Sequence, residues 1–526
     1  MLETANRIGY SLSRLGTETF RVFNPYTQTE LPGDFAVATV AEVNLAAEKA
    51  WQAWQEYRHF SGRQKAVFLR AIAAELEALG ETLIARVMEE TALPRARVEG
   101  ERGRTCGQLR MFADLVEDGS WVQAIIDTAL PDRKPLPRVD IRNMLQSTGP
   151  VVVFTASNFP LAFSTAGGDT ASALAAGCPV IVKAHASHAG TNALVSDAIL
   201  KAAKEAQMPD GVFASLQDAG IRVGTQLVQH PRVQSVAFTG SFQGGMALYK
   251  AAQQRQDPIP VFAEMGSVNP VFALPGKLES DAEQLAAEIA ASVNLGAGQF
   301  CTNPGVVVIQ DGPHAAVFAT ALQQSFETLV PSVMLNRGIY ENYLRARAHC
   351  LDVEGVSVGY IHPVGENERW EAYPAVATTT GANFLAQPSL QEEVFGPFTL
   401  LVRCADKAEM LAVADSFKGQ LTATVFGVET ELPDWRALIS GLADKVGRLI
   451  FNGVPTGVEV GHAMQHGGPF PAATDSRFTS VGSSAIRRFA RPVAYQNWPD
   501  AWLPPALQDA NPLEIARFVN GKWVLP

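Results

Sequence analysis

One cysteine stands in a setting where a thiol can react. Residues 298–305 read Gly-Gln-Phe-Cys-Thr-Asn-Pro-Gly, which places Cys301 in a turn between an Ala-rich helical run over 281–295 and a Val-rich strand over 306–309. Its glycine, amide and hydroxyl neighbours leave room for a substrate, and a thiolate is the strongest side-chain nucleophile near neutral pH. The alternative is an inert, small hydrophobic residue, as most cysteines are.

A single acid ends another apolar run. Residues 261–267 read Val-Phe-Ala-Glu-Met-Gly-Ser. The charged form of a carboxylate between Phe262 and Met265 is disfavoured, so we expect Glu264 to have a raised pKa, in the range useful for a general base. The alternative is an ordinary solvated carboxylate at the end of a strand.

The elements that position these side chains follow from the hydrophobic pattern. Helical spacing covers residues 41–57, 61–79, 81–91 and 96–116, with Ser61 as an N-cap and Gly80 as a stop. From Gly149, short apolar strands over 151–154, 180–183 and 235–238 alternate with helices over 165–176, 190–206 and 224–229. This alternation predicts a doubly wound parallel sheet, an α/β fold of the Rossmann type.

Ligands bind such sheets at the carboxyl ends of the strands. Asn158 follows the first strand, Lys183 ends the second, and residues 239–245, Thr-Gly-Ser-Phe-Gln-Gly-Gly, follow the third. The last segment fits a turn whose amides face a phosphate, although a Gly-x-x-x-x-Gly spacing is common. It lacks the Lys-Ser/Thr ending of a triphosphatase loop, so ATP is not favoured.

Composition excludes several classes of partner. A net charge of −11 argues against nucleic acid and anionic membranes, and no apolar run is long enough for a membrane span. The five cysteines are scattered and show no metal-ligand spacing, so we expect no metal and reduced thiols in a cytoplasmic protein. At 526 residues the chain should form two or three domains.

Five ordered motifs resemble the aldehyde dehydrogenase superfamily over roughly residues 20–495. They are Ser-Asn158-Phe-Pro, Phe-Thr-Gly240-Ser-x-x-x-Gly245, Glu264-Met-Gly-Ser, Gly-Gln-Phe-Cys301 and Glu-Glu393-Val-Phe395-Gly-Pro. More narrowly, residues 183–188, 298–305 and 458–469 resemble the branch with 2-oxoglutarate semialdehyde (2,5-dioxopentanoate) dehydrogenases and a bacterial NADP-dependent fatty aldehyde dehydrogenase.

The resemblance implies roles for the catalytic residues. Cys301 attacks the aldehyde, the side chain of Asn158 and the amide of Cys301 stabilise the oxyanion, and Glu264 activates the water that hydrolyses a thioester. It also implies that Lys183 bonds the adenosine ribose, that Glu393 and Phe395 hold the nicotinamide end, and that the turn with Gly240, Ser241 and Gly245 lies under the pyrophosphate.

Two positions depart from the common family pattern. Ala186 stands where NAD-preferring relatives often carry a glutamate that binds the ribose 2′-hydroxyl. Without that carboxylate, Lys183, His185 and Ser187 can donate to a 2′-phosphate, so we expect NADP to be preferred over NAD. Glu264-Met-Gly-Ser replaces Glu-Leu-Gly-Gly and leaves the acid intact.

The C-terminal third supplies a histidine and an arm. His466, before Gly-Gly-Pro, either tunes the ionisation of Cys301 or only packs against the entrance loop at residues 452–457. Residues 490–497 resemble the family strand that pairs with an arm near 121–146, which implies a homodimer or homotetramer. We expect a dinucleotide-binding domain over 1–120 and 147–260, a catalytic domain over 261–450, an oligomerisation arm over 121–146 and 485–500, and a tail over 501–526 without assigned function.

The resemblance favours 2-oxoglutarate semialdehyde as the substrate. Phe159 and Phe163 suggest an apolar pocket wall, which keeps medium or long aliphatic aldehydes open, and no arginine can be assigned to a substrate carboxylate from sequence. Two other classes are weighed. A non-catalytic structural relative would have lost Cys301 or Glu264, and a CoA-acylating enzyme typically lacks the base.

Overall fold

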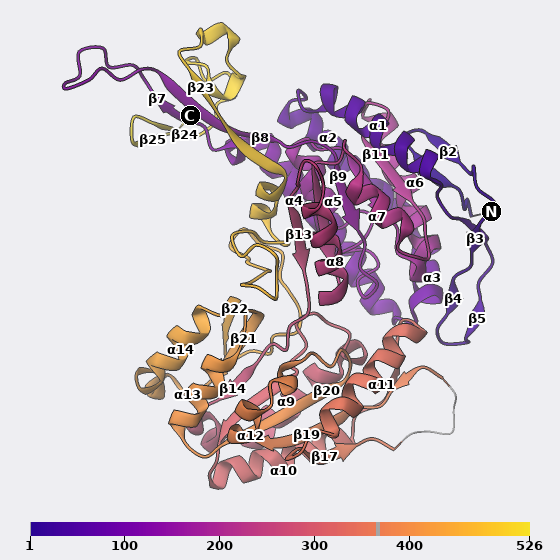
Figure 1. Cartoon of the computed structure of the whole chain (residues 1–526), viewed down its shortest axis with the longest axis vertical. Coiled ribbons are helices and arrows are strands. Elements are labelled where there is room, and N and C mark those ends of the chain that lie inside the picture. The colour runs from indigo at the N-terminus through magenta and orange to yellow at the C-terminus, as the bar shows by residue number, and fades with distance from the viewer. Residues whose placement is uncertain (1, 364–368, 526) are drawn as a thin grey trace.

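Two α/β lobes and a projecting arm make up the protein. The computed structural model describes residues 2–363 and 369–525 (Figure 1). The first lobe, indigo to magenta in Figure 1, contains the N-terminus, and the second lobe, pink to orange, follows it along the chain. Among the described residues, no helix has both the length and the apolar character needed to cross a membrane.

The first lobe is built on a seven-stranded sheet with the order β13-β12-β9-β10-β11-β1-β2. Strands β13 to β11 are parallel, while β1 and β2 extend the edge antiparallel. The strands are β1 (Asn6–Ile8), β2 (Ser11–Ser13), β9 (Val151–Phe154), β10 (Val180–Lys183), β11 (Phe213–Leu216), β12 (Ser235–Thr239) and β13 (Val261–Glu264).

Helices cover both faces of this sheet. Val151 and Val153 join one buried cluster with α2 to α6, whereas Val152 between them joins a second cluster with α1 and α7. Alternating residues of one strand thus bury opposite faces, and the predicted doubly wound fold is confirmed. The helices are α1 (Val40–Tyr57), α2 (Gly62–Ala78), α3 (Gly80–Thr91), α4 (Arg95–Asp118), α5 (Gly168–Ala176), α6 (Ala189–Glu205), α7 (Arg222–Gln229) and α8 (Phe242–Gln253).

The helix boundaries follow local capping chemistry. Ser61 caps α2 as predicted, because its hydroxyl accepts from the amide of Gln64 while the side chain of Gln64 returns to Ser61. Gly80 follows the end of α2 as predicted and is the first residue of α3, with φ +51 allowing an abrupt change of direction between the two helices.

The second lobe has its own seven-stranded sheet, with the order β17-β19-β20-β15-β14-β21-β22. Only β17 is antiparallel to its neighbour. The strands are β14 (Val271–Ala273), β15 (Val306–Gln310), β17 (Ser357–Ile361), β19 (Ala375–Thr380), β20 (Phe398–Cys404), β21 (Gln420–Phe426) and β22 (Val446–Phe451).

Helices again lie on both faces of the second sheet. The helix predicted from residue 281 is part of a longer α9, whose regular geometry is interrupted at Asp281 (φ −144°). The helices are α9 (Pro275–Asn294), α10 (Pro313–Glu327), α11 (Arg337–Leu351), α12 (Gly381–Ala386), α13 (Lys407–Ser416) and α14 (Arg436–Ala443). Short strand pairs complete the chain: β3 (Thr19–Phe20) with β6 (Phe35–Ala36), β4 (Phe23–Asn24) with β5 (Thr29–Glu30), and β16 (Ser332–Val333) with β18 (Glu371–Ala372).

The arm is a five-stranded sheet with the order β23-β8-β7-β24-β25. Its strands are β7 (Ile125–Asp127), β8 (Ile141–Ser147), β23 (Ala490–Gln496), β24 (Arg517–Val519) and β25 (Lys522–Val524). The C-terminal segment, expected as a separate tail, therefore supplies two strands of the arm and shares an apolar cluster with β7 (Figure 1).

Candidate active site

The loop that carries Cys301 is held by close backbone packing. Gly298 has φ +66, and a Cβ there would lie 2.2 Å from the carbonyl carbon of Gly396, so only glycine fits. Buried Asn269 donates its amide to the carbonyls of Cys301 and Asn303, both at 2.9 Å. These contacts fix the thiol just before β15, between the lobes.

Glu264 reaches the same place from the other sheet. It is the last residue of β13, and its backbone forms an isolated bridge with Ala473, on the segment that returns from β22 to the first lobe. The expected domain boundary at residue 260 falls directly before β13, whose four residues belong to the sheet of the first lobe.

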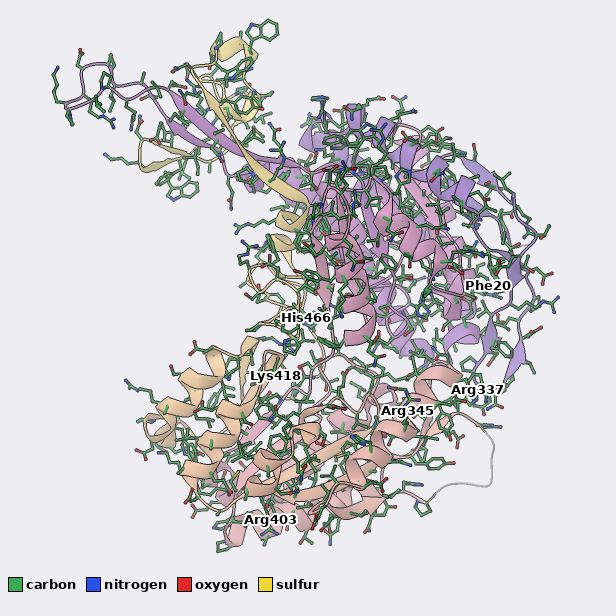
Figure 2. All side chains as sticks on the ribbon, in the orientation of Figure 1. Phe20, Arg337, Arg345, Arg403, Lys418 and His466 are labelled. Carbon is green, nitrogen blue, oxygen red and sulfur yellow. The ribbon has the colours of Figure 1, made fainter. Side chains whose placement is uncertain are left out.

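Cys301, His466 and Glu264 form one cluster, in which His466 and Glu264 are buried and Cys301 is half-buried. The Nε2 atom of His466 lies 3.5 Å from Cys301 Sγ and 2.8 Å from Glu264 Oε1. The hydroxyl of Ser480 donates to Glu264 Oε2 at 2.6 Å. Figure 2 shows His466 between the two lobes. A thiol beside an imidazole that is oriented by a carboxylate can lose its proton and act as a nucleophile.

The pKa directions correct one expectation. Burial raises the pKa of Glu264, as predicted, but the charge and hydrogen bond of His466, with Ser480 and Cys301, outweigh burial and leave the pKa lowered. The pKa of Cys301 is raised well above its usual range by burial and by the nearby Glu264 carboxylate. Cys301 is therefore a thiol at rest, and its proton must be removed when the substrate is attacked.

Asn158 and three phenylalanines flank the thiol. Asn158 Nδ2 donates to the carbonyl of Gln299 at 3.0 Å, which fixes the amide beside the cysteine loop. Phe159 packs edge-on against Phe163 at 5.2 Å and against Phe300 at 5.4 Å between ring centroids. These rings form an apolar cluster next to the cysteine, where an aldehyde chain can lie.

The residues expected at the adenosine ribose lie together after β10. Lys183 Nζ donates to the carbonyl of Asp218 at 2.7 Å, and Ser187 accepts from Asn336 Nδ2 at 3.0 Å. Ala186 begins a short 3-10 helix over Ala186–His188. Burial lowers the pKa of His185 well below its usual range, so its imidazole is neutral.

The glycine-rich turn after β12 is exposed at the N-terminus of α8, and the amide of Gly240 donates to the carbonyl of Glu264 at 3.1 Å. Gly240 and Ser241 are exposed, and Ser241 caps α8 by accepting from the amide of Gly244. Exposed amides at a helix N-terminus fit a pyrophosphate. Gly245 is buried instead, and a Cβ there would lie 2.7 Å from Met265 Sδ, so its small size serves the packing of α8.

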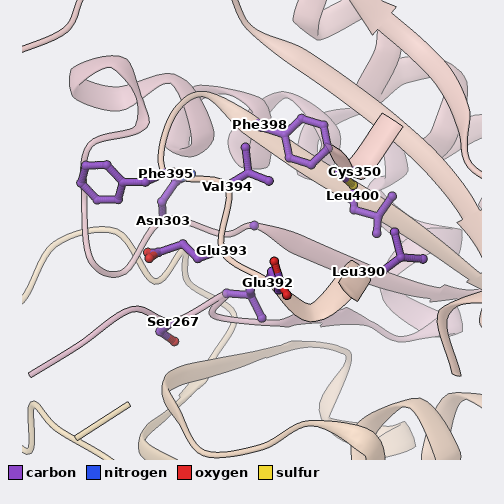
Figure 3. Close-up of a pocket in the computed structure, with 12 residues that line it drawn as sticks. Ser267, Asn303, Cys350, Leu390, Glu392, Glu393, Val394, Phe395, Phe398 and Leu400 are labelled. Atoms are coloured by element: carbon purple, nitrogen blue, oxygen red, sulfur yellow. The ribbon is translucent and has the colours of Figure 1, made fainter. Parts of the chain in front are cut away.

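Glu393 and Phe395 line a pocket in front of β20 (Figure 3). Burial raises the pKa of Glu393 to about 7, opposed by a hydrogen bond from the amide of Ser267. A Cβ at Gly266 would lie 2.4 Å from Glu393 Oε2, so the glycine after Met265 makes room for this carboxylate. The pocket thus joins a motif of the second lobe to the turn that follows Glu264.

Sequence reasoning missed the residues that support this cluster. Ser480 and Asn269 act through contacts with residues far away in the chain, and no local pattern marks them. Arg104, whose charge opposes the raised pKa of Cys301, had a weak signal, since it is a cation near the apolar face of a predicted helix. Two roles were expected for His466, tuning the ionisation of Cys301 or packing against the entrance loop. Its Nε2 atom lies 3.5 Å from Cys301 Sγ, a contact that packing against the loop does not require.

Two mostly parallel sheets, with the thiol between them, define an α/β protein of the Rossmann type. The chain belongs to the aldehyde dehydrogenase family, whose sequence profile, described as "Aldehyde dehydrogenase family", matches residues 13–338. It is 48% identical to alpha-ketoglutaric semialdehyde dehydrogenase of Acinetobacter baylyi, over 93% of this chain and 92% of that one. It is 49% identical to alpha-ketoglutaric semialdehyde dehydrogenase 2 of Azospirillum brasilense, over 96% of both.

Solved structures share the fold. A betaine aldehyde dehydrogenase of Staphylococcus aureus in complex with NAD+ matches with a TM-score of 0.81, 19% identity, and coverage of 96% of this chain and 97% of that one. A 1-pyrroline-5-carboxylate dehydrogenase matches with a TM-score of 0.78, 22% identity, and coverage of 94% and 92%.

Proposed function

We propose that this protein oxidises an aldehyde to a carboxylic acid with NAD(P)+, through a thiohemiacetal and a thioester on Cys301. The observation that carries the proposal is the cluster in which His466 Nε2 lies 3.5 Å from Cys301 Sγ and 2.8 Å from Glu264 Oε1. As the sulfur attacks the carbonyl carbon, the thiol proton passes to the Glu264 carboxylate, with which Cys301 shares a hydrogen bond, and it is released to solvent before the hydrolytic step. The side-chain amide of Asn158 and the amide of Cys301 donate to the oxyanion.

Bound NAD(P)+ supplies the hydride acceptor that converts the thiohemiacetal to a thioester. Glu264 then takes a proton from the hydrolytic water, and the Ser480 hydroxyl keeps its carboxylate oriented. Glu393 and Phe395 would hold the nicotinamide end, and the exposed turn at Gly240 and Ser241 would bind the pyrophosphate. Product analysis tests the class of reaction: we expect free acid, and acyl-CoA formation would contradict the role of Glu264.

NADP is the proposed preference. Ala186 offers no carboxylate to repel a 2′-phosphate, and Lys183 and Ser187 lie beside it with polar hydrogens. Because His185 is neutral, its contribution is a hydrogen bond rather than a charge. We expect a higher kcat/KM with NADP than with NAD, and a several-fold preference for NAD would overturn this proposal.

The proposed substrate is 2-oxoglutarate semialdehyde. It rests on the two relatives with 48% and 49% identity, both of them alpha-ketoglutaric semialdehyde dehydrogenases. The apolar wall of Phe159, Phe163 and Phe300 favours a second candidate, a medium or long aliphatic aldehyde. Comparing kcat/KM for the two substrates decides between them, and we expect the semialdehyde to be the better one.

His466 is proposed to tune the ionisation of Cys301 through Glu264. Replacing His466 with Asn keeps a polar group of similar size but removes the imidazole, whose charge and hydrogen bond lower the pKa of Glu264. Without them burial should raise the pKa of Glu264, so we expect the pH dependence of kcat/KM to shift to higher pH. An unchanged pH profile would leave His466 with a packing role only.

The arm is proposed as the contact of a homodimer or homotetramer. Its sheet projects from the first lobe and ends in β25, whose residues are all exposed. An exposed edge strand can pair with another copy of the chain. Light scattering of the full chain and of a chain ending at residue 500 tests this, and a monomer at micromolar concentration would contradict it.

A further inference from the structure

Two arginines of α4 face the aromatic wall of the site. Arg97 lies over Phe159 at 4.4 Å and over Phe300 at 4.6 Å, measured from the guanidinium carbon to the ring centroid. Arg104, seven residues further on and therefore on the same helix face, lies over Phe163 at 5.5 Å. Phe163 in turn is 6.1 Å from the ring of His466. The two cations therefore lie against the ring cluster next to Cys301.

Only one of these cations has a carboxylate partner. Arg97 Nε lies 3.4 Å from Glu101 Oε2. The other oxygen of Glu101 accepts from the amides of Leu161 and Ala162, both at 2.9 Å, so this acid is fully used. Arg104 Nη1 donates to the carbonyl of Val458 at 2.6 Å, while its Nε and Nη2 are buried and, within residues 2–363 and 369–525, have no hydrogen-bond partner.

The two free nitrogens form one edge of the guanidinium group. Arg7 shows what that edge binds, because its Nε and Nη2 hold the two oxygens of Asp197 at 2.9 and 2.8 Å. A carboxylate matches this fork with two parallel hydrogen bonds. An unpaired guanidinium out of contact with water is costly, so an anion that fills the edge gains binding energy.

The segment that Arg104 holds packs against the same ring cluster. Arg448 of β22 donates to the carbonyls of Pro455 and Gly457 at 2.7 and 3.0 Å, and Arg104 holds Val458 next to them. Val458 and Met464 pack against the phenylalanine cluster. A substrate chain between these rings would have the thiol at one end and Arg104 at the other.

We propose that Arg104 binds the carboxylate of the substrate and makes the site specific for aldehydes that carry a carboxylate at the far end of a short chain. This inference rests on the proposed function and names the residue that recognises that substrate. The phenylalanines contact the chain between the two ends. Arg97, neutralised by Glu101, supports the rings.

The test compares two aldehydes of five carbons, 2-oxoglutarate semialdehyde and the neutral pentanal. For Arg104→Met we expect kcat/KM to fall about 100-fold with the semialdehyde, mainly through KM, and to change less than about 3-fold with pentanal. Arg104→Lys keeps the charge and can still reach Val458 but lacks the fork, so we expect a loss of about 10-fold. The matched control is Arg110→Met on the exposed part of α4, where Arg110 pairs with Glu77, and it should change neither substrate.

The outcomes separate this inference from the function on which it rests. If both aldehydes lose activity equally in Arg104→Met and Arg104→Lys, Arg104 only holds the Val458 segment and the inference is wrong. If the unmodified protein prefers pentanal, the proposed substrate itself is wrong. Binding of the product 2-oxoglutarate gives a readout without turnover, because a bound ligand raises the thermal midpoint of the protein. We expect 2-oxoglutarate to raise the midpoint of the unmodified protein but not that of Arg104→Met.

Discussion

The two seven-stranded sheets present opposite ends to the site. In the first sheet, the candidate residues stand at or just after the carboxyl ends of strands: Lys183 ends β10, Gly240 follows β12 and Glu264 ends β13. In the second sheet they stand before the strands: Cys301 precedes β15, and Glu393 and Phe395 precede β20. The rule that ligands bind at carboxyl ends therefore locates only half of this site.

The two glutamates show what this difference means for charge. Glu264 meets His466 and Ser480 from the returning segment, and its pKa is lowered. Burial raises the pKa of Glu393 to about 7, because the hydrogen bond from the amide of Ser267 opposes burial only in part. Each carboxyl group is desolvated, so the partners that the other segments bring decide the sign of the shift.

The largest expected effect lies at the amino end of the second sheet. Cys301→Ala removes the nucleophile, and we expect acid formation to fall by about 10⁴-fold or more, with little change in the thermal midpoint. Cys404→Ala is the control, because Cys404 is buried in β20 away from the site and should lower stability but not activity. Acid formation that survives in Cys301→Ala would disprove the proposed chemistry.

A smaller effect is expected from the carboxyl end of the first sheet. Glu264→Gln keeps the shape of the side chain but cannot accept a proton, so release of acid should slow by about 10²- to 10⁴-fold. Attack by the thiol is less affected, because Nε2 of His466, 3.5 Å from the sulfur, no longer faces a carboxylate in this variant and can accept the thiol proton. Rapid quenching and mass spectrometry should then find an acyl group on Cys301, and its absence would shift the role of Glu264 to an earlier step.

Local patterns predicted the first sheet well. Strands β9 and β10 have the predicted bounds, because four consecutive buried residues between helices allow few other structures. Strand β11 was missed, since Phe-Ala-Ser-Leu is short and less apolar although all four residues are buried. The tail was not understood, because β24 pairs with β7, more than 390 residues away in the chain, and β25 pairs only with β24 within the described sheet.

The site was predictable where one motif carries one role. Cys301, Glu264 and Asn158 each stand in a short recognisable segment. The lowered pKa of Glu264 was not predictable from Phe262 and Met265, because His466 and Ser480 reach it from about 200 residues further along the chain. The same holds for Arg104. Among the described residues its Nε and Nη2 have no hydrogen-bond partner, and this depends on distant segments such as the one with Val458, which binds only Nη1.

Asn269 connects the cysteine loop to β21. Its loss should lower both the stability and the activity of the protein. It has φ +47, donates to the carbonyls of Cys301 and Asn303, and accepts from the hydroxyl of Thr422 at 3.0 Å. Asn269→Ala leaves these buried groups unpaired, so we expect a loss of about 3 kcal/mol and a clearly lower rate.

Asn497→Ala is the matched control, because Asn497 is exposed and has φ +55. It should show only the backbone cost, about 1 kcal/mol. Chemical denaturation and initial rates measure both variants. Equal losses would mean that Asn269 serves its backbone geometry rather than the cysteine loop.

The smallest expected effect concerns the opposite pKa shifts of the two glutamates. Since the pKa of Glu393 is raised to about 7 in the folded protein, the folded state holds this proton when the unfolded state, with a pKa of about 4.3, has lost it. Stability from this group is therefore present below about pH 4 and is lost as pH rises to about 7. Glu393→Gln should become more stable than the unmodified protein above pH 7.

Glu264 should behave in the opposite sense. Its folded pKa is lowered, so its contribution is present above the unfolded pKa and is lost as pH falls through the folded value. Glu264→Gln should therefore be less stable than the unmodified protein at pH 7, and the difference should shrink in acid. Thermal midpoints of the three proteins from pH 4 to pH 8, without cofactor, measure both trends. If the three plots of thermal midpoint against pH were parallel, the two carboxyl groups would not have opposite pKa shifts in the folded protein.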